Sequence, residues 1–70
     1  MSASDVRVLR ADADQARLAI EAAGITVHGS LPTPSGTMVT IVTQGATRQT
    51  LEDLLEADGI DAYSIVTITP

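Results

Sequence analysis

The chain repeats its own pattern of turn residues and apolar positions after half of its 70 residues. Gly24 and Gly59 lie 35 residues apart, and an isoleucine follows each of them directly. The segments before the two glycines match as well, with apolar positions at i, i+3 and i+4: Ala16, Ala19 and Ile20 in the first segment, and Leu51, Leu54 and Leu55 in the second. Such spacing is typical of one face of a helix. We therefore expect two halves with the same order of elements.

Local signals place one helix in each half. Asp12 is a favoured N-cap residue, and Gln15 three positions later has the spacing of a capping box. This predicts a first helix that runs through Ala23 and ends at Gly24, the residue type preferred in the left-handed C′ position. Thr47 is the corresponding N-cap of a second helix, which is predicted to run to about Asp58.

Short β-branched and apolar runs predict four strands, at residues 6–10, 25–28, 37–43 and 63–69. The third run carries apolar side chains on both faces, which favours a strand in the interior of the fold. Residues 29–36 contain two prolines and two glycines, so we expect a loop there. It is long for a hairpin connection, which makes it a candidate for mobility or partner contact.

The resulting order, β-α-β-β-α-β, predicts an α+β fold of the ferredoxin-like sandwich class. In this fold two helices cover one face of a four-stranded antiparallel sheet, ordered 4-1-3-2. We expect one domain over residues 1–70, with residues 1–4 disordered. The register of the last strand stays open, since either Tyr63 and Ile65 or Val66 and Ile68 could face the helices.

Composition excludes several functional classes. Nine acidic residues against four scattered arginines give a net charge of −5, and Tyr63 is the only aromatic residue, so the chain has neither the basic patch nor the stacking residues of a nucleic-acid binder. Without cysteine and with one histidine, it offers no disulfide and no zinc site of the usual kind. It has no signal-peptide pattern and no apolar run of membrane-spanning length. We expect a cytoplasmic protein without cofactor, metal or membrane contact.

The passages Glu21–Val27 and Glu56–Ile60 carry a helix-glycine-strand pattern. With the order of elements, they resemble the ACT domain and the similar ligand-sensing domain of leucine-responsive transcription regulators. The resemblance implies binding of an amino acid or similar effector at a subunit interface, near the loop after the first strand. In this chain Arg10 and Asp12 would then contact the ligand. The alternative is that Asp12 caps the helix and Arg10 is solvated.

No catalytic constellation is recognisable, so we expect no enzyme and name no catalytic residue. His28 is the residue with acid-base potential, but alternation favours a polar side chain on the outer face of an edge strand. The acidic residues of the second helix could bind a metal ion, although a solvated helix face is the usual role of such a pattern: Glu52, Asp53 and Glu56.

The outer face of the sheet is the main candidate for a binding surface. Alternation predicts that this interface contains Arg7, Leu9, Met38, Thr40, Val42, Tyr63 and Ile65. A monomer rarely leaves such an apolar patch exposed, so we expect a homodimer or another protein to cover it. The sequence thus predicts a small non-enzymatic, regulatory protein-interaction module, either a cellular regulator or an inhibitor encoded by a phage. An effector-binding domain of ACT type is the alternative.

Overall fold

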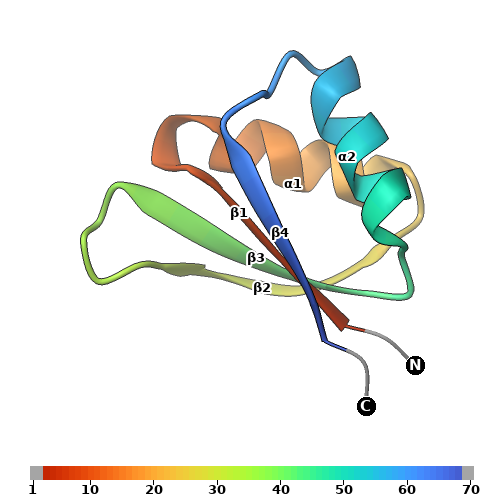
Figure 1. Cartoon of the computed structure of the whole chain (residues 1–70), viewed down its shortest axis with the longest axis horizontal. Helices are drawn as coiled ribbons and strands as arrows, with labels where there is room; N and C mark the ends of the chain where they lie inside the picture. The colour runs from red at the N-terminus through yellow and green to blue at the C-terminus, as the bar shows by residue number, and fades with distance from the viewer. Residues whose placement is uncertain (1–2, 69–70) are drawn as a thin grey trace.

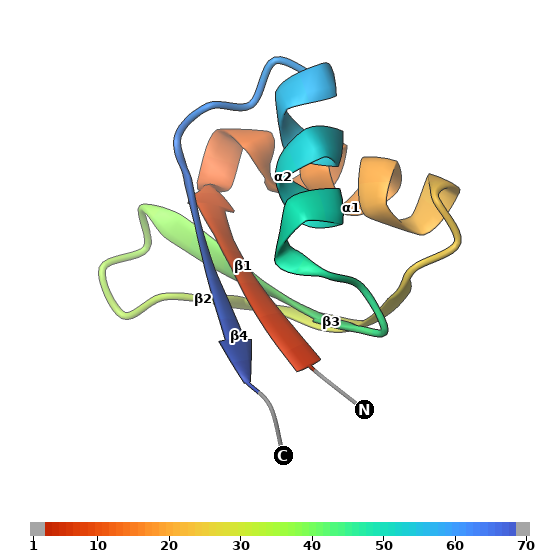
Figure 2. The same cartoon turned by 45° about the vertical axis from the view of Figure 1, so that its right-hand side comes forward.

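The computed structural model describes residues 3–68 and has the predicted ferredoxin-like arrangement (Figure 1). Its elements are β1 (Ala3–Leu9), a short 3-10 turn η1 (Arg10–Asp12), α1 (Ala13–Ala22), β2 (Thr26–Pro32), β3 (Met38–Gln44), α2 (Arg48–Ala57) and β4 (Tyr63–Ile68). The strands pair antiparallel in the order β2-β3-β1-β4, which is the predicted order counted from the other edge. Both helices lie on one face of the sheet, and β4 ends beside the start of β1 (Figure 2).

The second strand is longer than predicted, and the loop after it is shorter. Val27 pairs with Thr43 and Gly29 pairs with Val42, so His28 is an extra residue that forms a bulge in β2. Beyond this bulge the strand continues through Gly29. Pro32 can end this strand because β2 is an edge strand, where a missing N–H removes no hydrogen bond from an inner ladder. The predicted loop over residues 29–36 is therefore wrong for residues 29–32 and confirmed for residues 33–36, and the hairpin connection spans residues 33–37.

The two helices end in the same way, as the repeat predicts. Gly24 and Gly59 have φ angles of +82° and +77°, the left-handed region that favours glycine. After each glycine an isoleucine N–H bonds back across the helix end, from Ile25 to the Ile20 carbonyl (3.3 Å) and from Ile60 to the Leu55 carbonyl (2.9 Å). These are Schellman motifs, which satisfy carbonyl groups that the helix leaves unpaired.

The helix starts differ from each other. The hydroxyl of Thr47 accepts a hydrogen bond from the N–H of Thr50 (3.2 Å), so the predicted N-cap of α2 is confirmed. Asp12 makes no such bond, and the predicted capping box is absent. The side-chain amide of Gln15 instead donates to the carbonyl of Asp58 (2.9 Å), which ties the start of α1 to the end of α2.

The core lies between the helices and the inner face of the sheet. Its fully buried large apolar side chains are Val6, Val8, Ile20, Ile41, Leu51 and Leu55. On β4 the pairs Val6–Ile65 and Val8–Tyr63 place Tyr63 and Ile65 on this inner face, so including them in the outer interface was wrong.

The start of β1 also differs from the prediction. Ala3 and Ser4 form the first residues of this strand instead of a disordered tail. The predictions for residues 1–2 and for the last residue of the fourth strand lie outside the described residues.

Candidate functional site

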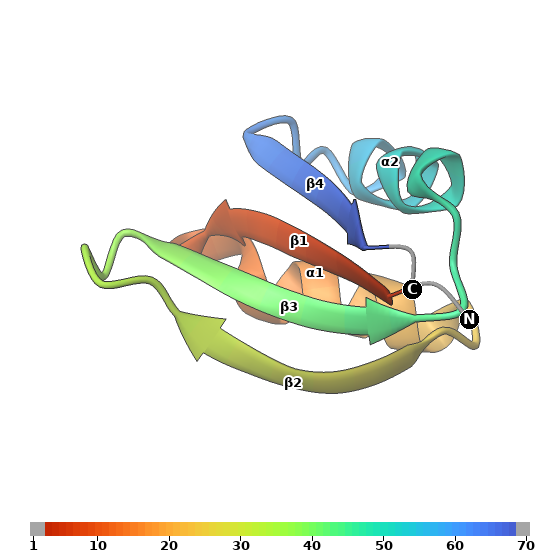
Figure 3. The ribbon, with the colours of Figure 1, turned by 60° about the horizontal axis from the view of Figure 1, so that its bottom comes forward.

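The outer face of the sheet carries no helix (Figure 3). Residues directly opposite each other in a sheet share a face, so the strand register places the outward side chains in rows. In the order β2, β3, β1 and β4, one row contains Leu31, Thr40, Arg7 and Ser64, and the next contains Gly29, Val42, Asp5 and Val66. The pair Leu9–Met38 extends the face at one end.

Five outward apolar side chains form what we call the outer apolar patch: Leu9, Leu31, Met38, Val42 and Val66. Leu31 and Val66 are 62% and 55% exposed, and Leu9 is 41% exposed. Large exposed apolar groups gathered on one face are typical of a surface that contacts another molecule.

The patch surrounds two opposite charges on the inner strand β1. Asp5 and Arg7 are two residues apart and point to the same side of the sheet. Within residues 3–68, neither side chain makes an ion pair or a hydrogen bond. The outer face therefore presents one free carboxylate and one free guanidinium near its middle.

The structure brings together five of the seven side chains predicted for the interface, namely Arg7, Leu9, Met38, Thr40 and Val42. Two members of the patch were missed. The sequence pattern predicts a loop at Leu31, which Gly29 and Pro32 flank, and Val66 belongs to the other of the two possible registers of β4. Alternation along β2 from Val27, with His28 counted as a bulge, would have placed Leu31 on the outer face, but alternation without the bulge places it on the inner face.

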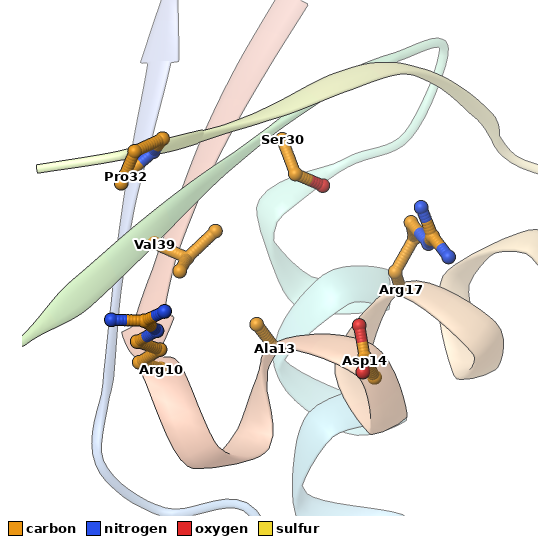
Figure 4. Close-up of a pocket in the computed structure, with 7 residues that line it drawn as sticks. All are labelled: Arg10, Ala13, Asp14, Arg17, Ser30, Pro32 and Val39. Atoms are coloured by element: carbon orange, nitrogen blue, oxygen red, sulfur yellow. The ribbon is translucent and has the colours of Figure 1, made fainter.

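On the opposite, helix-covered face, a pocket of about 480 Å³ opens between α1 and the β2–β3 hairpin (Figure 4). Its lining residues are Arg10, Ala13, Asp14, Arg17, Ser30, Pro32 and Val39. The four from η1 and α1 have the spacing i, i+3, i+4 and i+7, which places them on one face of the helical segment. Sequence reasoning could have found Arg17 by this spacing from Arg10.

The pocket carries two cationic groups and one anionic group. The Arg10 side chain makes no hydrogen bond or ion pair within the described chain, whereas Arg17 Nε lies 3.4 Å from Glu21 Oε1. Neither arginine forms an ion pair with Asp14 among residues 3–68. Of the two residues predicted for a ligand, Arg10 lines this pocket and Asp12 does not.

The remaining candidates occupy ordinary structural positions. His28 Nε2 lies 2.6 Å from Gln44 Oε1 in an exposed hydrogen bond, as expected of a polar side chain on an edge strand. Glu52 pairs with Arg48 (3.2 Å), and Asp53 accepts from Gln49 (2.9 Å). In the part of the chain that is described, no three metal-ligating side chains come together.

Tyr63 contacts an acidic side chain of α2. Its hydroxyl donates a hydrogen bond to Glu56 (3.1 Å) from a partly buried ring. Desolvation raises the pKa of Tyr63, and the hydrogen bond to Glu56 and the negative charges of Glu56 and Glu52 raise it further. The phenol therefore stays a neutral donor over the physiological range.

The chain was also compared with known proteins. No protein-family model matches it, and no curated protein matches it either. Among the described residues, no helix is long and apolar enough to cross a membrane.

Proposed function

We propose that this protein is a small non-enzymatic protein-interaction module that self-associates through the outer face of its sheet. The observation that carries the proposal is the outer apolar patch with the unpaired Asp5 and Arg7 at its centre. A second copy of the same chain is the partner whose surface matches both features, because it offers an equal apolar area and the two opposite charges.

The register of the strands supports one arrangement of two copies. Consider a two-fold axis that runs parallel to the sheet and crosses β1 at right angles over Val6. The axis brings two sheets face to face with their β1 strands antiparallel, so that Asp5 of each copy lies opposite Arg7 of the other. Both charges gain a partner, and the contact is self-complementary.

The same two-fold rotation places each of the two central rows of one copy opposite the other central row of its partner. Leu31 of one copy then meets Gly29 of the other, and Val66 meets Ser64. A large side chain thus faces a small one at both edges of the sheet. Such alternation lets two sheets approach to the usual distance of about 10 Å.

The size of the face limits the area that the contact can bury. Four strands about 4.8 Å apart and seven residues rising about 3.4 Å each give a face of roughly 19 by 24 Å. Two such faces cover roughly 900 Å², below the roughly 1,200 Å² at which stable interfaces begin. We therefore expect a reversible dimer with a dissociation constant in the micromolar range or above, which suits a module that exchanges partners.

Charge reversal tests the proposed pairing directly. Arg7→Asp places two carboxylates opposite each other at both ends of the symmetric pair, and Asp5→Arg places two guanidinium groups there. Each single change should weaken the dimer at least about tenfold, or about 1.4 kcal/mol. The combined Asp5→Arg and Arg7→Asp variant should regain most of the affinity, as measured by sedimentation equilibrium.

Leu31 and Leu18 provide a matched pair for the apolar part of the contact. Both leucines are 62% exposed, but Leu18 lies on α1, away from the outer face. Leu31→Asp should abolish self-association, and Leu18→Asp should leave it unchanged. The proposal is refuted if the wild-type chain is monomeric at millimolar concentration, or if the double charge reversal recovers nothing.

A further inference from the structure

We infer that the pocket between α1 and the β2–β3 hairpin is a binding site for a short-chain dicarboxylate. The pocket lies on the helix-covered face, opposite the proposed dimer contact, so the inference stands apart from the proposed function. Its volume of about 480 Å³ falls within the usual range for small-molecule sites.

The distribution of charge points to an anion. The chain has only four basic residues against nine acidic ones, yet two of the four, Arg10 and Arg17, line this one pocket. The Arg10 guanidinium has no partner within residues 3–68, and Arg17 has a single exposed contact with Glu21. A guanidinium matches a carboxylate through paired N–H donors, and Ser30 adds a hydroxyl from β2.

The spacing of the two arginines points to two carboxylates instead of one. Arg10 and Arg17 are seven residues apart, or about 10 Å along the helical segment at about 1.5 Å per residue. Figure 4 shows them at opposite ends of the pocket, with Ala13 between them. A ligand that meets both guanidinium groups therefore has an anionic group at each end.

The wall between the two ends is apolar. Ala13, Pro32 and Val39 contribute hydrocarbon from α1, β2 and β3. An inorganic phosphate ion would meet one arginine and leave this wall uncovered, whereas a few methylene groups between two carboxylates would cover it. Asp14 is the one anionic group in the lining, and it disfavours every anion that enters.

The test uses three probes that separate these contributions: glutarate with two carboxylates, butyrate with one, and inorganic phosphate. Binding is followed by the amide NMR shifts of the full chain. We expect glutarate to bind more tightly than butyrate or phosphate and to shift the amides of Ala13, Ser30 and Val39. Arg10→Gln and Arg17→Gln should each weaken glutarate binding about tenfold.

Two further variants control for general charge effects. Arg48→Gln removes a positive charge on α2, outside the pocket, and should leave glutarate binding within about twofold, as expected for a screened distant charge. Asp14→Asn removes the opposing charge and should strengthen binding. The inference is overturned if glutarate does not bind, if phosphate or butyrate binds equally well, or if Arg48→Gln weakens binding as much as Arg10→Gln.

Discussion

Ile20 is the one large side chain that α1 buries in the core. The other buried residue of this helix is Ala16, whereas α2 buries Leu51 and Leu55. Ile20 is 0% exposed. The contact of α1 with the sheet, and with it one wall of the dicarboxylate pocket, therefore depends strongly on this residue.

Ile20→Ala should cost roughly 2–5 kcal/mol of unfolding free energy, since it removes three buried carbon atoms and leaves a cavity. A domain of 70 residues has a total stability of roughly 4–10 kcal/mol. A loss of about 3 kcal/mol would lower the melting temperature by roughly 12–24 °C, at about 4–8 °C per kcal/mol for this size.

Urea unfolding followed by circular dichroism measures this loss. The experiment should use protein concentrations below the dimer dissociation constant, because self-association adds a concentration-dependent stability. Ile20→Val should cost only about 0.5–1.5 kcal/mol. The exposed Leu18→Ala on the same helix should stay within about 0.5 kcal/mol. If Ile20→Ala proves no more destabilising than Leu18→Ala, α1 is not held on the sheet as described.

Two other predictions concern the helix starts and the single tyrosine. Thr47→Ala removes the N-cap bond to Thr50 and should cost about 1 kcal/mol of unfolding free energy in the same assay. Asp12→Ala removes no cap bond and should cost clearly less. Equal losses of unfolding free energy in the two variants would contradict the cap assignment. The folded-state pKa of Tyr63 is raised above 10.0, so its contribution to stability is present below about pH 10 and is lost as the pH rises through the folded pKa. Ultraviolet titration of tyrosinate should show a lower pKa in Glu56→Gln, and Tyr63→Phe should flatten the alkaline loss of stability; an unchanged pKa in Glu56→Gln would contradict the role of that carboxylate.

The fold could be predicted because its main signals are local and occur twice. A glycine after an amphipathic segment marks the end of a helix through backbone geometry alone, and Gly24 and Gly59 both adopt the expected left-handed conformation. With the helices located, the short β-branched runs between them leave few topologies to consider. The sheet order follows from these elements.

The wrong predictions concern segments of β2 and β4 whose structure depends on contacts with residues distant in sequence. Gly29 and Pro32 usually interrupt a strand, and pairing with β3 at the edge of the sheet is what keeps them within β2. In β4 both alternating sets are apolar, so periodicity cannot choose between them, and the neighbours Val6 and Val8 select Tyr63 and Ile65 for the core.

The candidate sites, like the fold, could be predicted where a local pattern is sufficient, and could not be predicted where contacts distant in sequence decide the structure. Five outer-face residues followed from alternation along β1 and β3, because those strands are inner and regular. The pocket did not follow, since it requires β2 to continue past Gly29 and bring Ser30 and Pro32 opposite α1. Asp12 looked like a cap or a ligand residue, but η1 occupies the segment before α1, and Gln15 bonds to the end of α2 instead.

The β2–β3 hairpin serves both proposed contacts through alternate residues. Ser30 and Val39 line the pocket, while their chain neighbours Leu31 and Thr40 point to the outer face. Because successive side chains of a strand point to opposite sides, a change on the outer face replaces no side chain of the pocket. Leu31→Asp can therefore remove self-association while glutarate still binds, and Arg10→Gln can do the reverse. Loss of both properties in one of these variants would instead indicate a damaged hairpin, which circular dichroism and the amide spectrum of that variant would reveal.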